Sequence, residues 1–297
     1  MKKENNHKKN FIAVGVLVGI IALVTACGNS GKLDLNKEYK PEYRSNEYND
    51  LKYKAVYNLK TFMEMQGEPM NAERAFDFIY SFSGKEAEGE NSHLISITLE
   101  NIDAKMITAL GQQKFDTRHI NGKSFDMMIS ANGSKLSYPH PDQLLRLDMG
   151  AMAGGELNLE FILKYNFPEL PDSPVKGGET WQETFQRTQI EGSLQPLVNI
   201  NAVHQYVDVE KVDGYDCIKV ESTYKAEIEG SEEQMGMIWT YIGKLEGSST
   251  WYFAVQEGFV VKVSTKEKSK GIIKSTGENP MEVPIQQEIS VDIITIR

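Results

Sequence analysis

The chain has 297 residues and a formal net charge of −10, from 32 basic and 42 acidic side chains. An acidic chain argues against binding to nucleic acid or to anionic lipid headgroups, because both need clustered lysine and arginine. With 40% hydrophobic residues, a chain of this length can bury the apolar core of one large domain or of two small ones.

The amino terminus has the three parts of an export signal. Four lysines precede an uncharged apolar run from Phe11 to Ala26, and this run ends in small residues. The run is shorter than the roughly 20 residues that a helix needs to cross a bilayer core. We therefore predict a signal peptide over residues 1–26 rather than a permanent transmembrane helix.

The end of this run, Leu23-Val24-Thr25-Ala26-Cys27, resembles the lipobox of bacterial lipoproteins, in which an aliphatic residue and two small ones precede a cysteine. The resemblance implies that Cys27 receives a diacylglyceryl group and becomes the first residue of the mature protein. Each buried methylene contributes about 0.8 kcal/mol, so two acyl chains hold a protein firmly. We expect an extracytoplasmic protein, lipid-anchored to a bacterial membrane. The alternative is an ordinary signal peptide with a cysteine near its end.

Removal of residues 1–26 makes the chain more acidic and leaves one thiol. The mature chain keeps 28 basic and 41 acidic residues, a formal charge of −13. Once Cys27 carries the lipid, Cys217 has no partner for an intramolecular disulfide. Cys217 lies in a strand-like stretch without a nearby histidine, so we predict a structural thiol rather than a nucleophile.

Residues 27–50 are polar and predict a flexible tether. From Leu51 to Gln66 apolar and polar residues alternate, and the same period of two recurs in residues 76–82, 94–99 and 283–293. Strands with one polar face belong to antiparallel sheets. Two dipeptides, Asn132-Gly133 and Asp213-Gly214, predict tight hairpin turns between such strands, because these residues accept a positive φ.

Helical periodicity is scarce. Residues 142–147 and 157–165 predict short helices, and residues 104–110 are a weaker third candidate. Three prolines between Phe167 and Trp181 forbid regular strand pairing. Residues 141–180 are therefore predicted to be a helical and proline-rich crossover.

An internal comparison suggests a duplication. Ile120-Asn121-Gly122-Lys123-Ser124 and Leu245-Glu246-Gly247-Ser248-Ser249 share an aliphatic residue, a glycine and a serine at equal spacing, with a second glycine further on, Gly133 and Gly258. We predict two related β-halves, residues 51–140 and 181–297. The alternative is that any two hairpins share turn glycines. The predicted fold is mainly β (α+β), with large curved antiparallel sheets and a few short helices.

The pattern Pro171-x-x-Pro174-Val175-x-x-Gly178-Glu179-x-Trp181 looks like that of a group of exported, β-rich bacterial proteins. That group is distantly similar to the carriers that move lipoproteins or lipids across the cell envelope. The resemblance implies a curved antiparallel sheet closed by short helices around an apolar cavity. It carries no catalytic residues to this chain.

Motifs for chemistry are not found. Gly122-Lys123-Ser124 lacks the first glycine of a phosphate-binding loop and leads into a strand. The acidic run Glu86 to Glu90 lacks the spacing of a calcium loop and predicts a solvated hairpin tip. The mature histidines are scattered without close carboxylates: His93, His119, His140 and His204. We therefore predict no catalytic residue, no metal site and no cofactor.

The methionines are numerous for one chain, at 12. They either fill the core of a twisted sheet or form an adaptable surface for apolar ligands. The expected function is a non-catalytic binding module for an apolar ligand or a partner protein of the envelope, held on the membrane through Cys27. The alternatives are a structural or assembly lipoprotein and an unrecognised enzyme.

Replacing Cys27 with alanine should abolish acyl labelling and leave an uncleaved precursor, because the acceptor thiol is lost. Metabolic labelling with a clickable palmitate analogue and the mass of the purified protein check both effects. Cys217→Ala is the matched control and should label normally. A Cys27→Ala variant that labels at the normal level would contradict the prediction.

Overall fold

The computed structural model describes residues 33–45, 48, 51–65, 67–85, 92–140, 146–148, 156–158, 160–188, 197–234, 237–276 and 280–296. These residues form strands and one short helix, α1 (Glu160–Asn166). The strands are β1 (Leu51–Met65), β2 (Glu68–Lys85), β3 (Ser92–Thr108), β4 (Gly111–Lys114), β5 (Ser124–Ser130), β6 (Leu136–Ser137), β7 (Arg146–Asp148), β8 (Glu156–Asn158), β9 (Thr180–Thr188), β10 (Leu197–Val212), β11 (Tyr215–Gln234), β12 (Met237–Ala254), β13 (Phe259–Ser275) and β14 (Glu282–Ile296).

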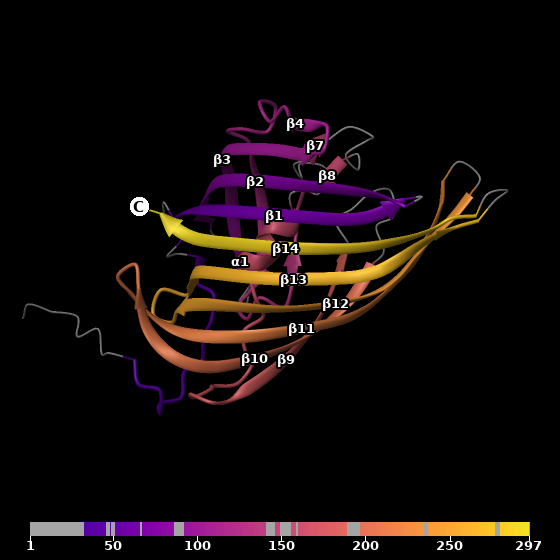
Figure 1. Ribbon diagram of the computed structural model, residues 1–297. Coiled ribbons are helices and arrows are strands. Elements are labelled where there is room, and N and C mark those ends of the chain that lie inside the picture. Colours follow the sequence, from indigo (N-terminus) through magenta and orange to yellow (C-terminus); the bar gives the residue numbers. More distant parts are fainter. Residues whose placement is uncertain are drawn as a thin grey trace, which may run out of the picture. The chain divides into compact units, whose positions relative to one another are not determined.

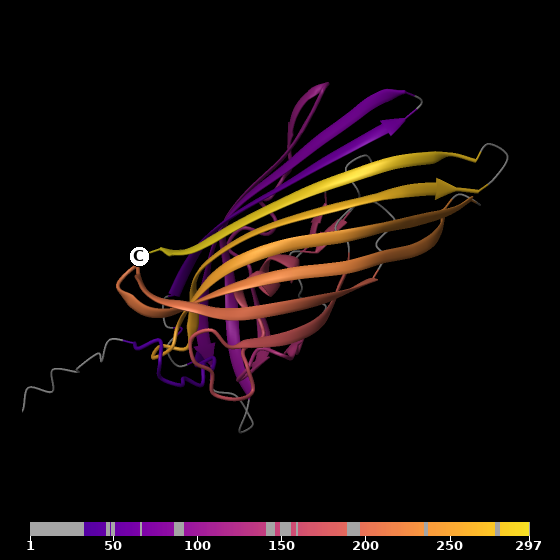
Figure 2. The ribbon, with the colours of Figure 1, turned by 60° about the horizontal axis from the view of Figure 1, so that its bottom comes forward.

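Twelve strands form one antiparallel sheet in the order β6-β5-β3-β2-β1-β14-β13-β12-β11-β10-β9, with β4 paired to β3 (Figure 1). The strands β7 and β8 form a separate small sheet. The large sheet is curved, and α1 lies on its inner side (Figure 2). The predicted mainly β fold with a large antiparallel sheet is confirmed.

The first and last long strands lie side by side. Twelve residue pairs connect β1 to β14, from Lys52 opposite Ile296 to Met63 opposite Ile285. This pairing places the two predicted β-halves in one continuous sheet. The glycines that suggested a duplication differ locally: Gly122 has a φ of +77° in a turn, whereas Gly247 lies inside β12. The relation between the halves stays a prediction.

The predicted alternation is visible in burial. Along β1 buried side chains alternate with more exposed ones from Leu51 to Thr61, and residues 76–82, 94–99 and 283–293 all lie in strands, β2, β3 and β14. At the predicted hairpin turn between β10 and β11, Asp213 and Gly214 both have positive φ angles, 49° and 90°. The period-two pattern therefore identified half-buried strands.

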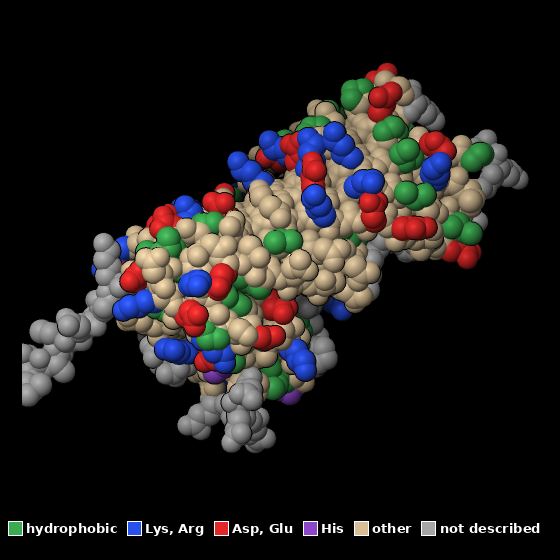
Figure 3. Space-filling view, turned by 90° about the horizontal axis from the view of Figure 1, so that it is seen from below, with side chains coloured by type: hydrophobic (Ala, Val, Ile, Leu, Met, Phe, Trp, Pro, Cys, Tyr) green, Lys and Arg blue, Asp and Glu red, His purple; other side chains and the backbone are tan. Residues whose placement is uncertain are grey.

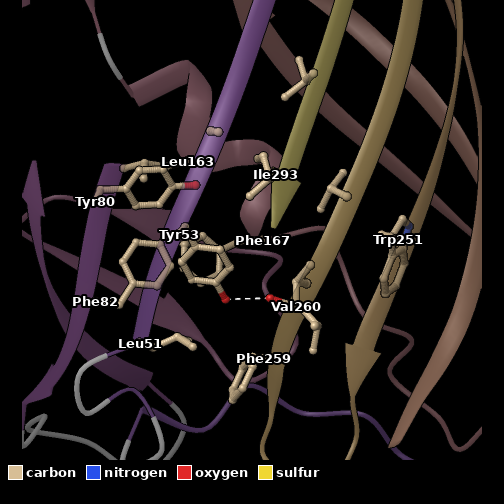
Figure 4. Close-up of a cluster of buried hydrophobic side chains, with 14 of the residues drawn as sticks. Leu51, Tyr53, Tyr80, Phe82, Leu163, Phe167, Trp251, Phe259, Val260 and Ile293 are labelled. Carbon is tan, nitrogen blue, oxygen red and sulfur yellow. Dashed lines mark hydrogen bonds between the residues drawn. The ribbon is translucent and has the colours of Figure 1, made fainter. Parts of the chain in front are cut away.

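The main core lies on the inner face of the sheet. The rings of Tyr53 and Phe82 are 5.0 Å apart, and Phe167, which follows α1, stacks on Phe82 at 5.4 Å (Figure 4). The Tyr53 hydroxyl donates a 2.6 Å hydrogen bond to the backbone oxygen of Val260, so it ties β1 to β13. The segment after α1 is thus a part of the core.

The helix predicted over residues 104–110 is wrong, the one over 142–147 is contradicted at its last two residues, and the one over 157–165 is correct in part. Residues 104–108 belong to β3, where pairing with β2 overrides the weak helical pattern. Of residues 142–147, Arg146 and Leu147 pair with β8 as part of β7, and the others lie outside the described residues. The helix expected over 157–165 is α1, but Leu157 and Asn158 precede it as a strand.

Much of the predicted tether packs on the sheet. Tyr43 is 1% exposed, and its hydroxyl donates a hydrogen bond of 2.7 Å to the backbone oxygen of Pro168. Tyr48 is fully buried and bonds to the backbone of Gly258. Tyr39 pairs with Val175. The described residues between 33 and 48 therefore belong to the folded unit, and a flexible tether is not what they form.

Two glycines face each other across β12 and β13. Gly243 pairs with Gly271, and a Cβ atom on Gly271 would lie 2.5 Å from the backbone oxygen of Ile242 and 2.7 Å from the Tyr241 ring. Real Cβ contacts are longer than this. The Tyr241 ring lies over Gly271, which has no side chain of its own. An aromatic ring packed over a glycine is known to stabilise glycine in a sheet.

Gly271→Ala should lower the free energy of unfolding by about 1–3 kcal/mol, because an added methyl group overpacks this contact. Denaturant unfolding of the purified protein measures the change. Lys270→Ala is the control, since this exposed neighbour points away from the Gly243–Gly271 contact and should have little effect. Equal stability of Gly271→Ala and the unmodified protein would contradict the described packing.

Candidate functional site

Buried polar side chains cross the inner face of the sheet and interrupt its apolar surface. Each is at most 8% exposed. We call this set the polar belt; its members are Thr61, Arg74, Glu183, His204, Ser222, Ser249, Thr265, Glu267, Ser269 and Gln287. Such groups are buried at a high free-energy cost unless they are hydrogen-bonded.

Strand register explains why these residues meet. His204 on β10 pairs with Ser222 on β11, and Ser222 pairs with Ser249 on β12. Ser249 in turn pairs with Thr265 on β13. Side chains of paired residues point to the same face of a sheet and contact each other. The hydroxyls of Ser249 and Thr265 are accordingly 2.8 Å apart.

Glu183 is the most buried carboxylate of the belt, at 4% exposed. Its Oε1 atom lies 2.9 Å from the Lys164 Nζ atom on α1, and its Oε2 atom lies 3.2 Å from His204 Nε2. Burial alone would raise the pKa of Glu183, but the hydrogen bond with His204 and the charge of Lys164 outweigh it and lower the pKa below its ordinary value. Glu183 therefore ties α1 to the sheet as a carboxylate.

A hydrogen-bond chain continues from His204. Its Nδ1 atom is 2.7 Å from the Ser222 hydroxyl, which also accepts a 2.9 Å hydrogen bond from the Trp251 indole. A neutral imidazole that donates from Nε2 to Glu183 and accepts at Nδ1 satisfies all four groups. The Trp181 ring lies over the imidazole, with the ring centroids 5.2 Å apart.

Serine, histidine and a carboxylate in a line resemble the catalytic set of hydrolases. Here the Ser222 hydroxyl is buried, at 2% exposed, and it is held by Trp251. The neighbouring cavity has room for one or two water molecules and not for a substrate. The arrangement can hold and orient polar groups.

That cavity, of about 30 Å³, lies between α1 and the sheet, and it adjoins the belt. Lys164, Tyr165 and Pro168 line it from the side of α1, and Phe185, Trp251 and Val263 contribute apolar walls from the sheet. The Tyr165 hydroxyl donates to Glu267 at 3.3 Å. Asn166 is 1% exposed, and its Nδ2 atom has no hydrogen-bond partner among the described residues.

Beyond the belt the inner face becomes apolar again. A second apolar cluster forms on β10, β11, β12 and β14, separate from the main core. Its buried members are Val198, Ile200, Ala226, Ile228, Tyr241, Leu245 and Ile285. The inner face therefore has three zones: the main core, the polar belt and the second apolar cluster.

The residues singled out by sequence have different places. Cys27 and the run Glu86 to Glu90 lie outside the described residues. Cys217 is fully buried, and burial raises the pKa of its thiol to about 12, as suits a structural thiol. Ser124 begins β5 instead of a helix, which agrees with the rejection of a phosphate loop.

The histidines are not all remote from carboxylates. His204 contacts Glu183, so the expectation of scattered histidines is wrong at this position. His93 lies 3.1 Å from the Ser45 hydroxyl, and burial lowers the pKa of this histidine. Across the described ranges, His, Cys, Asp and Glu side chains nowhere gather in a set of three that could hold a metal ion.

The sequence contains a signal of the belt that the predictions above do not use. Along β13 the inward positions Val261 and Val263 are followed by Thr265, Glu267 and Ser269. In such a strand the inward positions change from apolar to polar residues. The same change at the inward positions of several strands indicates a polar zone on the buried face.

Comparisons with known proteins give no family. No protein-family model and no curated protein matches the chain. Solved structures similar to this chain include an outer membrane channel from Pseudomonas putida F1, at 8% identity over 83% of this chain and 96% of that chain, with a TM-score of 0.22. OpdK of Pseudomonas aeruginosa with vanillate has 7% identity, 82% and 99% coverage, and a TM-score of 0.19. Salmonella typhi OmpF with daunomycin has 8% identity, 86% and 100% coverage, and a TM-score of 0.23.

With such low TM-scores, these likenesses carry no argument about this chain. Separately, the one helix among the described residues, α1, is too short to cross a membrane, and no membrane-spanning helix is found there.

Glu183→Gln should lower the free energy of unfolding at pH 7 by about 2–4 kcal/mol, because it removes a hydrogen-bonded charge and leaves Lys164 unpaired. Since folding lowers the pKa of Glu183, the stabilisation is fully present above the ordinary glutamate pKa of about 4.3 and is lost as the pH falls through the lowered value. Denaturant unfolding at pH 7 and pH 3 measures both effects.

The matched control is Glu288→Gln, which removes an exposed carboxylate paired with Lys268 on the outer face. This variant should change the unfolding midpoint little, because exposed ion pairs are screened by water. An equal loss of stability in the two variants would contradict the assigned role of Glu183.

Proposed function

We propose that the protein is a lipid-anchored, extracytoplasmic and non-catalytic binding protein that holds an apolar ligand with a polar end between α1 and the inner face of the sheet. The observation that carries this proposal is the sequence of zones on that face. The polar belt, which contains the carboxylates of Glu183 and Glu267, borders the second apolar cluster. The cavity lies between the belt and α1. A ligand with an apolar body and a polar end matches these zones.

For such a ligand to enter, α1, which also buries Leu163 in the main core, would have to move away from the sheet. Polar links hold α1 to the sheet, Lys164 to Glu183 and Tyr165 to Glu267. The Lys164 ammonium also lies over the Phe185 ring, at 4.8 Å from its centroid. Displacement of this short helix would enlarge the cavity and free a charged and a hydroxyl group for the polar end of the ligand.

The same contacts support the proposed non-catalytic role. The Ser222 hydroxyl already binds His204 and Trp251, and a structural network of this kind positions groups without needing a reaction. The buried Cys217 thiol stays protonated at neutral pH, since its pKa is raised to about 12. These side chains are better explained as parts of a binding wall.

A partner-binding role has one observation in its favour. Ile242 on β12 pairs with Ile272 on β13, and Ile272 pairs with Pro284 on β14. Both isoleucines are exposed on the outer face, at 49% and 38%. Exposed aliphatic residues side by side are suited to protein contacts, which is what an assembly lipoprotein would use.

The proposal is tested with a fluorescent long-chain fatty acid titrated into residues 28–297, which include all described residues of the core. We expect saturable binding near one probe per chain. Lys164→Ala should weaken binding at least fivefold, because the ammonium that would meet the carboxylate end is lost. Lys270→Ala, on the outer face, should leave the affinity unchanged. Absence of saturable binding by the folded protein would refute the proposal.

A further inference from the structure

The opposite face of the same strands has a feature that the proposed ligand site does not use. A groove of about 580 Å³ crosses the outer face of β1, β14, β13, β12 and β11. Gly247 and Glu267 also line it, and because Glu267 belongs to the polar belt, the groove lies behind that belt. Two cross-strand rows of side chains supply most of the rest of the lining, together with Tyr224 and Ile289.

The first row contains hydroxyl and amide groups around one lysine. Strand register sets its order across the sheet as Asn58, Ser290, Lys266, Ser248 and Thr223. Lys266 is exposed and forms no ion pair with a described residue. Its directly opposite cross-strand neighbours are the uncharged serines Ser290 and Ser248, and the carboxylates of the groove lie at diagonal positions.

The second row alternates in charge. Its order across the sheet is Lys60, Glu288, Lys268, Glu246 and Lys225. Glu288 is 2.9 Å from Lys268. Figure 3 shows lysine and acidic side chains side by side over the middle of this face, next to a broad band of uncharged surface.

The groove has a small excess of basic side chains on an acidic protein, although Lys268 pairs with Glu288 and Lys60 lies 3.9 Å from Glu73 on β2. Its outward side chains comprise four lysines and two glutamates, whereas the whole chain has a net charge of −10. The inward Glu267 does not alter this count, because its carboxylate meets Tyr165 on the other face. A groove lined by one excess sign of charge attracts ligands of the opposite sign.

The lysines of the second row stand on every second strand: Lys225 on β11, Lys268 on β13 and Lys60 on β1. Neighbouring strands are about 4.8 Å apart, so successive lysine positions are roughly 10 Å apart. A row of this length suits a chain with repeated anionic groups better than a single ion. The hydroxyl and amide groups of the first row would bond to the hydroxyls of the same chain.

We propose that this outer groove binds a linear, hydroxyl-rich polyanion laid across the strands, with Lys266 as its central contact. Single-stranded nucleic acid is a poorer match, because such sites stack bases on aromatic rings. The one aromatic residue that lines this groove, Tyr224, belongs to an inward position of β11. The anionic groups can be phosphates or carboxylates, and the experiment distinguishes the two.

The test uses the full-length protein in neutral detergent micelles at low ionic strength. Fluorescently labelled poly(glycerol phosphate), polygalacturonate and neutral dextran are titrated in parallel by anisotropy. We expect saturable binding of at least one polyanion, weaker binding at higher salt, and no binding of dextran. The stronger of the two polyanions identifies the anionic group.

Lys266→Ala should weaken polyanion binding at least tenfold. Lys274→Ala is the matched control, because Lys274 lies on the same strand and face outside the groove and pairs with Glu282. It should change the affinity less than twofold. Both side chains are exposed, so unchanged thermal unfolding midpoints verify that both variants fold.

Three results would overturn the proposal: no saturable binding of either polyanion, equal loss in Lys266→Ala and Lys274→Ala, or binding of dextran as strong as that of the polyanions. The inner-face variant Lys164→Ala separates this site from the proposed ligand site. It should leave polyanion binding unchanged, and a loss there would place the polyanion on the wrong face for this proposal.

Discussion

The carboxylate of Glu183 lies inside the protein, and it stays charged because Lys164 and His204 reach it. A buried carboxylate without such partners would be strongly destabilised. This one interaction connects the edge strand β9, the strand β10 and the helix α1. It also places the only described helix over the inner face, beside the cavity and the second apolar cluster, so the proposed ligand site depends on it.

The inner and outer faces carry different chemistry on the same strands, because successive side chains of a strand point to opposite faces. On β13, Glu267 is part of the polar belt, while its neighbours Lys266 and Lys268 line the outer groove. A ligand inside and a polyanion outside would therefore contact the same segment of sheet. A small bend of these strands would move side chains on both faces.

Period-two alternation was a reliable guide where a strand has one buried face. It identified the strands around residues 51–65, 76–82, 94–99 and 283–293. The helix predicted over residues 104–110 is wrong at residues 104–108, where the helical propensity is weak and pairing with a neighbouring strand decides the outcome. The tether prediction failed between residues 33 and 48 for a related reason. Composition indicates polarity, but Tyr43 and Tyr48 bury their rings in the core and bond to backbone oxygens far along the chain.

The sequence by itself determined the strand-rich class, the turn at Asp213-Gly214 and the structural character of Cys217, since each depends on residues near one another in the chain. It also carries the prediction of a lipid anchor at Cys27. Only the tertiary structure decided that β1 pairs with β14, that His204 meets Glu183, and that serines and lysines from five strands form one groove. These contacts depend on strand register between distant segments, which local composition and spacing do not encode.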